Sequence, residues 1–257
     1  MGVDLFEFHA DKYRCERCGM RGWCIGYCSE GARPACDAAQ RRQRVQHAGS
    51  HLFRVGDPFQ SLYVVRSGSV KTYLTSEDGE EQILGFHQPG DIVGFDAIAR
   101  GRHPCSAAAL ETSSVCTLSF QKLTKLCQDS PQLLARLVEM MSRETLRLTD
   151  SLLLGRRSAE QRVATFLLVQ AERQGERGYS PTALRLAMSR TDIGKYLGLT
   201  VETVSRILTR FQDLGVLAKE RNQVRINDLG ALRQLTGEID ARALDGPAGR
   251  NDAAQTA

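Results

Sequence analysis

The sequence predicts an α+β protein in which an antiparallel β domain, one long helix and a winged helix-turn-helix follow one another. Three observations lead to this prediction: short β-rich runs with glycine turns at 51–120, a stretch at 130–156 that lacks proline after its first turn, and a helix-turn-helix pattern at 190–214. The length of 257 residues also favours two domains with a connection between them. The expected segments are 1–36 (cysteine-rich), 37–129 (β domain), 130–156 (long helix), 157–237 (winged helix-turn-helix) and 238–257 (flexible tail).

The composition is that of an ordinary globular protein. Hydrophobic residues make up 42% of the chain and charged residues 25%, so a substantial core can be buried. No apolar run approaches the roughly 18 residues that a membrane span needs, and the start of the chain lacks the order of a secretory signal. We therefore expect a cytosolic (cytoplasmic) protein with no membrane partner. The net charge of +4 is too small to indicate a polyanionic partner unless the excess lies in one place.

The β domain is predicted from short runs that are rich in β-branched and aromatic residues. These runs are 62–65, 70–74, 82–86, 92–95 and 114–118. Glycines that mark turns accompany them at positions 56, 68, 79, 90 and 94. Short strands with glycine-bearing turns at this spacing indicate an antiparallel sandwich or barrel.

A long helix is predicted over 130–156, with Ser130 as N-cap and Pro131 at the first helical position. Apolar residues near heptad spacing predict a dimer interface along it, and Glu144 and Thr145 interrupt that stripe. The predicted interface residues are Leu134, Leu137, Met141, Leu148 and Leu152. The alternative is a helix that packs only on its own sandwich, but roughly 25 residues at ~1.5 Å each would overhang so small a domain.

A second amphipathic helix is predicted over 159–174, and a helix-turn-helix over 190–214, where Thr200 can cap the second helix. The apolar residues of that second helix recur at i, i+3, i+4 and i+7 and form one inward stripe. They are Val204, Ile207, Leu208 and Phe211. Glu202, Ser205 and Arg206 are left together on the outer face, where they would face a DNA major groove.

The residue types on that outer face suit base recognition. Arginine can bond O6 and N7 of guanine with about 1–3 kcal/mol of discrimination, and glutamate can accept from the cytosine amino group. The alternative is that Glu202 and Arg206 form an ordinary i, i+4 surface ion pair.

Charge and a predicted wing support the DNA-binding interpretation. Between residues 180 and 227 eight basic residues (Arg185, Arg190, Lys195, Arg206, Arg210, Lys219, Arg221, Arg225) stand against four acidic ones (Asp192, Glu202, Asp213, Glu220). Phosphate binding needs such an excess of basic residues. Residues 216–219 and 224–226 read as the two strands of a wing from which Arg221 could reach the DNA backbone.

The cysteines indicate inorganic chemistry. Eight are present, and disulfides do not persist in a reducing compartment. The pattern Cys15-x2-Cys18-x5-Cys24 brings three thiols within ten residues, and thiolates bind both iron–sulfur clusters and zinc. The fourth ligand must lie elsewhere. Zinc remains an alternative, with Cys28 or Cys36 as fourth ligand, although a zinc ribbon usually has two separated Cys-x2-Cys pairs.

Several motifs resemble one family of regulators. They are the Cys-x2-Cys-x5-Cys start, SLYVVRSGSVKTY at 61–73, GFHQPGDIVGFDAI at 85–98, LETSSVC at 110–116 and GLTVETVSR at 198–206. The sequence from Cys15 to Gly237 resembles the fumarate-and-nitrate-reductase regulators (FNR), the oxygen-sensing branch of the catabolite-activator (CRP/FNR) superfamily. The resemblance implies that the β domain is a cyclic-nucleotide-binding-like β-roll of the jelly-roll type.

The resemblance also implies a cofactor. It is an oxygen-labile [4Fe–4S] cluster on Cys15, Cys18, Cys24 and Cys116, the last because it follows the Leu-Glu-Thr of the family pattern. Cys28 and Cys36 depart from the minimal pattern, and we expect Cys105 and Cys127 to be small core or surface thiols. No cyclic nucleotide is expected, because the Glu and the Arg-Ser pair that hold it in relatives are missing, and this chain has Gly94-Phe95-Asp96 and then His103-Pro104-Cys105.

The implied function is a transcription activator or repressor whose cluster controls dimerisation. Its Glu202, Ser205 and Arg206 would read a palindrome of TTGAT half-sites, and the turn at Ser76 to Glu81 would contact RNA polymerase. Two alternatives stay open. One is a zinc-stabilised, metabolite-responsive regulator of the same fold. The other is an iron–sulfur enzyme, which is disfavoured because the five histidines are scattered and form no acid–base cluster.

Overall fold

A computed structural model of the chain describes residue 25 and residues 40–220 and 223–237. The chain divides into two compact units, Met1–Gly155 with Ala187–Val201, and Arg156–Leu186 with Glu202–Ala257. We describe each unit by itself. Within the described part of the chain, no helix has the length and apolar character to cross a membrane.

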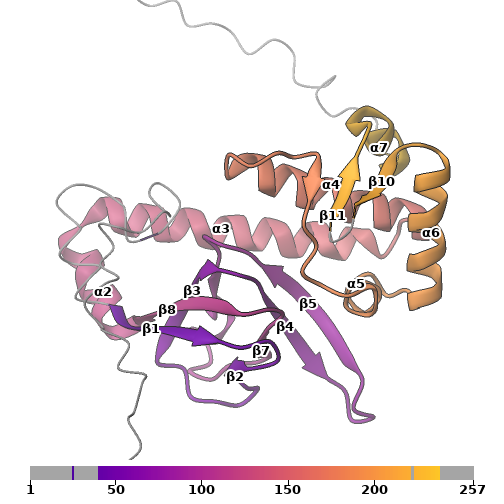
Figure 1. The fold of residues 1–257 in the computed structure, drawn as a ribbon. Helices are drawn as coiled ribbons and strands as arrows, with labels where there is room; N and C mark the ends of the chain where they lie inside the picture. The colour runs from indigo at the N-terminus through magenta and orange to yellow at the C-terminus, as the bar shows by residue number, and fades with distance from the viewer. Residues whose placement is uncertain (1–24, 26–39, 221–222, 238–257) are drawn as a thin grey trace, which may run out of the picture. The chain divides into compact units, whose positions relative to one another are not determined.

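The first unit is built on two antiparallel four-stranded sheets that form a β-roll (Figure 1). One sheet has the order β1-β8-β3-β6, with β1 at Gln40–Gln46, β8 at Ser113–Ser119, β3 at Ser61–Ser67 and β6 at Ile92–Val93. The other has the order β2-β7-β4-β5, with β2 at His51–Phe53, β7 at Ser106–Ala109, β4 at Val70–Thr75 and β5 at Glu81–His87. The predicted antiparallel sandwich is confirmed.

The five runs predicted from the sequence lie on β3, β4, β5, β6 and β8. Three strands of the β-roll were not predicted, because their residues carry little strand signal: β1 reads QRRQRVQ, β7 reads SAAA and β2 has three residues. Their pairing supplies what local propensity does not, since β1 and β3 flank β8, while β2 and β4 flank β7. The backbone conformation explains why one of the predicted turn positions requires glycine. Gly68 has a φ of 76°, and a Cβ there would collide with Ser113.

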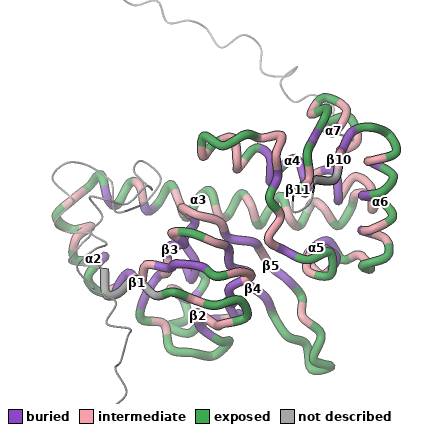
Figure 2. Tube along the Cα trace, viewed as in Figure 1, coloured by how far each residue is buried: buried purple, intermediate pink, exposed green. Residues whose placement is uncertain are grey.

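Side chains alternate between two apolar layers along β3, β6 and β8 of the first sheet. The layer between the sheets holds Phe53, Val65, Val70, Val93, Cys105, Ala107 and Val115. The layer on the opposite face holds Leu62, Val64, Ile92 and Leu118 together with Ile25, Leu123, Leu133 and Leu137. We call this second group the helix-side cluster. Figure 2 shows the buried residues concentrated in the strands of the β-roll.

Helices α2 (Phe120–Asp129) and α3 (Pro131–Leu154) cover the helix-side cluster. The long helix agrees with the predicted range of 130–156 to within two residues at each end. Its start also agrees, because the hydroxyl of Ser130 accepts a hydrogen bond from the backbone N–H of Leu133 at 3.4 Å. The unit is completed by the short η3 (Phe95–Ala97) and by α5 (Arg190–Leu197).

Most of the second unit is helical. It contains α4 (Ala159–Glu176), nearly all of α6 (Val201–Asp213) and α7 (Leu229–Thr236), and a small sheet of order β10-β11-β9. The bounds of these strands are Leu217–Glu220, Gln223–Ile226 and Ala183–Leu184. Strands β10 and β11 pair antiparallel and form the predicted wing. Arg221, the expected phosphate contact of the wing, lies outside the described residues.

The first helix of the helix-turn-helix, α5, falls in the first unit, and nearly all of the second helix, α6, falls in the second. Helix α5 contacts β5 of the β-roll and is therefore grouped with the first unit. The capping box between Ser189 and Asp192 starts α5, and Gly198 ends it in the left-handed conformation with a φ of 65°. The turn is tight, because a Cβ on Gly194 would collide with the carbonyl of Leu199.

Candidate DNA interface and cluster site

Helix α6 has the two faces that the sequence predicts. Val204, Ile207, Leu208 and Phe211 are all buried, and Val204 and Phe211 have no exposed surface. On the other side Glu202 and Arg206 are exposed and Ser205 is half-buried. Their side chains can therefore reach a partner without disturbing the core.

The alternative, an ion pair between Glu202 and Arg206 within α6, is not found in the described part of the chain. Among the ion pairs of the described residues, none joins Glu202 to Arg206. Arg210 instead pairs with Glu160 of α4, and Lys195 lies 3.8 Å from Glu81. These two basic residues, which the sequence assigns to the DNA-facing charge excess, thus have acidic partners within the protein. The charge available to phosphates is smaller than the count along the chain suggests.

Cys116 is the one predicted cluster ligand that lies within the described residues. It sits in the middle of β8, opposite Gln43 of β1 and Val64 of β3. Its side chain is half-buried and packs against the helix-side cluster. Cys15, Cys18 and Cys24, like Cys28 and Cys36, lie outside the described residues.

Ile25 places the chain next to Cys116. It directly follows Cys24 in the sequence, has no exposed surface, and belongs to the same helix-side cluster. Consecutive Cα atoms are about 3.8 Å apart. The predicted ligand of the N-terminal segment is therefore bonded to a residue that is already buried in the apolar layer beside Cys116. Sequence reasoning missed Ile25, since a lone isoleucine among cysteines and glycines carries no periodic signal.

The helix-side cluster also connects Cys116 to the long helix. Leu133 and Leu137 of α3 are buried members of this cluster, and Met140 packs against it. Along the chain, about fifteen residues separate Cys116 from the start of this helix. In the folded protein the two are connected by packing, because Cys116 and α3 border the same apolar layer.

The remaining described thiols are poorly suited to metal binding. Cys105 is buried and its thiol donates to the Asp96 carboxylate at 3.2 Å; burial, together with the Asp96 charge, raises the pKa of Cys105. Burial also raises the pKa of Cys127. Both thiols therefore stay protonated at neutral pH, whereas a ligand must be a thiolate. No three His, Cys, Asp or Glu side chains of the described residues are grouped so that they could hold a metal ion.

Where the resemblance places the Arg-Ser pair that anchors a cyclic nucleotide, this chain has His103-Pro104-Cys105. The ring of His103 is only 3% exposed and stacks on Phe53 with centroids 3.6 Å apart. Burial lowers the pKa of His103, so the ring is neutral near pH 7. The next residue, Pro104, has no backbone N–H to donate.

An exposed apolar stripe runs along α3. Its members follow one another at alternating steps of four and three residues, which is heptad spacing. They are Leu134, Val138, Met141, Leu148 and Leu152, with Thr145 in the remaining position. Leu152 is the most exposed of them, at 80%.

The stripe differs from the predicted interface at two places. Leu137 is buried in the helix-side cluster, so Val138 occupies its position on the exposed face. Glu144 is also turned away from the stripe, since it accepts from Arg147 at 3.1 Å, and Arg147 in turn lies 3.3 Å from the buried Asp91 of the β-roll. Strict heptad counting from Leu134 would have found Val138. Thr145 alone interrupts the stripe.

Comparisons with known proteins agree with these features. Residues 43–130 match the family model of the cyclic nucleotide-binding domain, and residues 161–235 match that of the Crp-like helix-turn-helix domain. A β-roll followed by a long helix and this helix-turn-helix defines a DNA-binding transcription regulator of the CRP/FNR class. Such regulators dimerise, and they are not enzymes, as the sequence predicts.

Curated relatives that match over most of their length identify the family. The chain is 44% identical over 225 residues to the fumarate and nitrate reduction regulatory protein of Escherichia coli (strain K12), covering 87% of this chain and 90% of that protein. It is 43% identical to the fumarate nitrate reduction regulatory protein of Klebsiella oxytoca, with the same coverage. The chain belongs to the FNR family.

Solved structures share the fold. FixK2 from Bradyrhizobium japonicum is 33% identical, with a TM-score of 0.69 over 76% of this chain and 96% of that chain. A CooA mutant from Carboxydothermus hydrogenoformans is 22% identical, with a TM-score of 0.63 over 77% of this chain and 88% of that chain, and supports the fold alone.

Proposed function

We propose that this FNR-family regulator responds to oxygen through a [4Fe–4S] cluster held by Cys15, Cys18, Cys24 and Cys116. The observation that carries the proposal is the burial of Ile25, the residue after Cys24, in the apolar layer that Cys116 and α3 border. This layer joins Ile25 and Cys116 to Leu133 and Leu137 of α3.

The surroundings of Cys116 suit such a cofactor. Its thiol is half-buried beside apolar side chains, and no described acidic or histidine side chain forms a competing metal site with it. When bound, a [4Fe–4S] cluster held by four thiolates supplies iron and sulfide that oxygen can attack. Cys28 and Cys36 are then additional thiols of the segment.

The protein's own residues would convert this binding into dimerisation. Ile25 lies in the apolar layer that Cys116 borders and to which Leu133 and Leu137 attach α3. A fixed α3 presents the exposed stripe to the same stripe of a second copy. If Ile25 leaves this layer when the cluster is lost, a cavity remains beside Leu133 and Leu137. The packing of α3 on the layer is then weaker.

A dimer is the form that reads DNA. Two copies present two α6 helices, and Glu202, Ser205 and Arg206 of each would contact one TTGAT half-site of a palindrome. One copy alone engages half of the bases and phosphates and binds weakly. Cyclic nucleotides play no part in this regulation, because His103-Pro104-Cys105 stands in place of the Arg-Ser pair that binds the phosphate, and the ring of His103 is buried and neutral.

Contact with RNA polymerase is the remaining part of the proposal. Residues 76–80 of the turn between β4 and β5 are exposed, and the turn is closed by the backbone hydrogen bond from Ser76 to the carbonyl of Glu80 at 2.9 Å. Glu81 is less available, because its carboxylate is paired with Lys71. We therefore assign the contact to residues 76–80.

The test is purification without oxygen, followed by measurement of iron, acid-labile sulfide and visible absorbance. About four iron and four sulfide per chain are expected, with absorbance that bleaches in air. Cys116→Ser should abolish this absorbance, and the matched control Cys127→Ser should keep it. Colourless protein that contains zinc, or loss of the absorbance in the control variant only, would overturn the proposal.

A further inference from the structure

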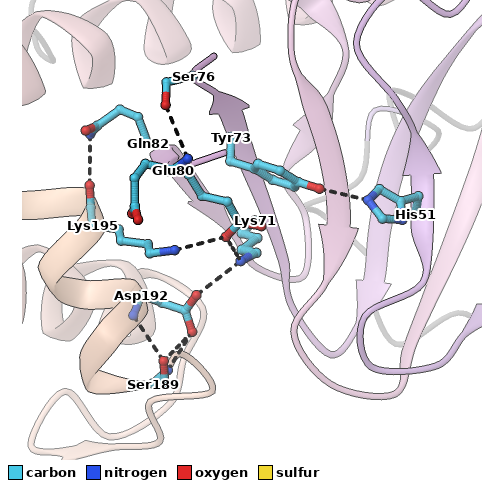
Figure 3. A network of polar contacts seen from close by, with 10 residues as sticks. His51, Lys71, Tyr73, Ser76, Glu80, Gln82, Ser189, Asp192 and Lys195 are labelled. Atoms are coloured by element: carbon cyan, nitrogen blue, oxygen red, sulfur yellow. Dashed lines mark hydrogen bonds and ion pairs between the residues drawn. The ribbon is translucent and has the colours of Figure 1, made fainter. Parts of the chain in front are cut away.

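A group of four charged side chains joins the β-roll to α5, the first helix of the helix-turn-helix (Figure 3). Lys71 of β4 donates to the Glu81 carboxylate of β5 at 2.7 Å and to the Asp192 carboxylate of α5 at 3.2 Å. The ammonium of Lys195 lies 3.8 Å from the same Glu81 oxygen that Lys71 contacts. We call these four residues the ionic clasp. Positive and negative charges alternate through it, so each like-charged pair is separated by an opposite charge.

Neutral contacts accompany the clasp. The side-chain amide of Gln82 donates to the backbone carbonyl of Lys195 at 2.8 Å, and the ring of Phe86 lies 5.3 Å from that of Tyr196. These contacts come from β5 and from the last turn of α5. The clasp is thus flanked by one hydrogen bond and one aromatic contact between β5 and α5, and together these contacts restrict how α5 is oriented on β5.

The clasp is only partly exposed to water. The exposed fractions are 16% for the Lys71 side chain, 18% for Asp192 and 29% for Glu81. Burial alone would lower the pKa of Lys71, but the hydrogen bond with Glu81 and the charge of Asp192 outweigh it and raise this pKa. Burial would raise the pKa of Asp192, but the bonds from Ser189 and the charge of Lys71 lower it. Both groups are therefore held in their charged forms.

Asp192 links the start of α5 to the sheet. One of its oxygens accepts from the backbone N–H of Ser189 at 3.0 Å, which caps the helix, while the other accepts from Lys71. Only three residues separate the end of α5 from the start of α6. A restraint on α5 therefore also restrains Val201, the residue at which the predicted DNA-recognition helix α6 begins.

We propose that the ionic clasp fastens the helix-turn-helix to the β4–β5 hairpin and so makes DNA affinity depend on the β-roll. This inference rests on the DNA-binding role of the family and does not need an iron–sulfur cluster. When α5 is held in place, helix α6 loses less conformational entropy on binding DNA, as preorganised elements do in other interfaces. Without the clasp, α5 detaches more often and the operator is bound more weakly.

The test combines hydrogen exchange with DNA binding for Lys71→Gln, Asp192→Asn and the double variant. Lys125→Gln, on the exposed side of α2, is the matched charge control. Exchange of the amides at 190–197 is expected to be about fivefold faster in Lys71→Gln and unchanged in the control. Asn at position 192 can still accept the hydrogen bond from the Ser189 backbone, so Asp192→Asn removes the charge and keeps the cap. Because Lys71 and Asp192 are paired in the clasp, the double variant should exchange clearly more slowly than the product of the two single effects.

The DNA measurement uses a duplex with two TTGAT half-sites and anoxically prepared protein, and a severalfold loss of affinity is expected for Lys71→Gln. This part depends on the proposed operator, whereas the exchange measurement does not, so the two can fail separately. Unchanged α5 exchange in Lys71→Gln, or single effects that multiply fully, overturns the clasp. Faster exchange with unaltered affinity of an operator that the wild type binds overturns its link to DNA.

Discussion

Replacement of Arg206 tests the DNA-reading face most directly. The side chain is exposed and makes no ion pair with Glu202, so its removal should leave the free energy of unfolding within about 0.5 kcal/mol of wild type. Its expected partner is the guanine of TTGAT, where a forked contact contributes about 1–3 kcal/mol of discrimination. A palindrome engages two copies, so Arg206→Ala should lose about 2–6 kcal/mol of preference for guanine over adenine at both half-sites.

The assay is competition between the TTGAT palindrome and the same duplex with guanine changed to adenine in both half-sites. Arg206→Lys is the matched variant, because lysine keeps the charge but cannot make the forked contact. Both variants should bind the two duplexes almost equally, while Arg206→Lys keeps more of the overall affinity. If Arg206→Ala weakens both duplexes by the same factor, Arg206 contacts phosphate and the assignment is wrong.

Three further predictions concern the first unit. Val138→Glu puts a charge into the exposed stripe of α3 and should give monomers in sedimentation of anoxically prepared protein, whereas Leu146→Glu, 61% exposed but outside the heptad positions, should stay dimeric. Dimers of both variants would exclude this interface. Leu133→Ala should lower the free energy of unfolding in urea by about 2–5 kcal/mol, because Leu133 is fully buried; a loss below 1 kcal/mol would contradict its place in the core. The stability difference between wild type and Lys71→Gln should be constant from about pH 5 to 9. It should shrink below about pH 4, since the pKa of Asp192 is lowered, and again above about pH 10, since the pKa of Lys71 is raised. A difference that grows toward low pH would refute the pairing.

Much of the fold was predictable because its signals are local. The buried stripe of α6, from Val204 to Phe211, follows from the helical repeat alone, and the start of α3 follows from Ser130 and Pro131. The strands that the sequence missed, β1, β2 and β7 of the β-roll and β9 of the second unit, are defined by their partners rather than by their own residues.

The candidate site was predictable in part. The order of cysteines and the outer face of α6 are visible in the sequence, and so is the apolar repeat of α3. Which residues of that repeat turn outward is not visible, because Leu137 and Val138 are both apolar neighbours. Their roles depend on where the sheet lies, and the sheet covers Leu137.

The sequence by itself determined the order of β domain, long helix and helix-turn-helix and the family, and it supplied the candidate residues for metal binding and DNA recognition, since these depend on residue identity and on spacing within a few turns. Tertiary structure alone decided that Ile25 lies in the layer beside Cys116, and that Lys71 pairs with Asp192, 121 residues later. The physical reason is that such contacts arise when strands pair and helices cover them, and a pattern confined to neighbouring residues contains no information about which distant side chains that packing brings together.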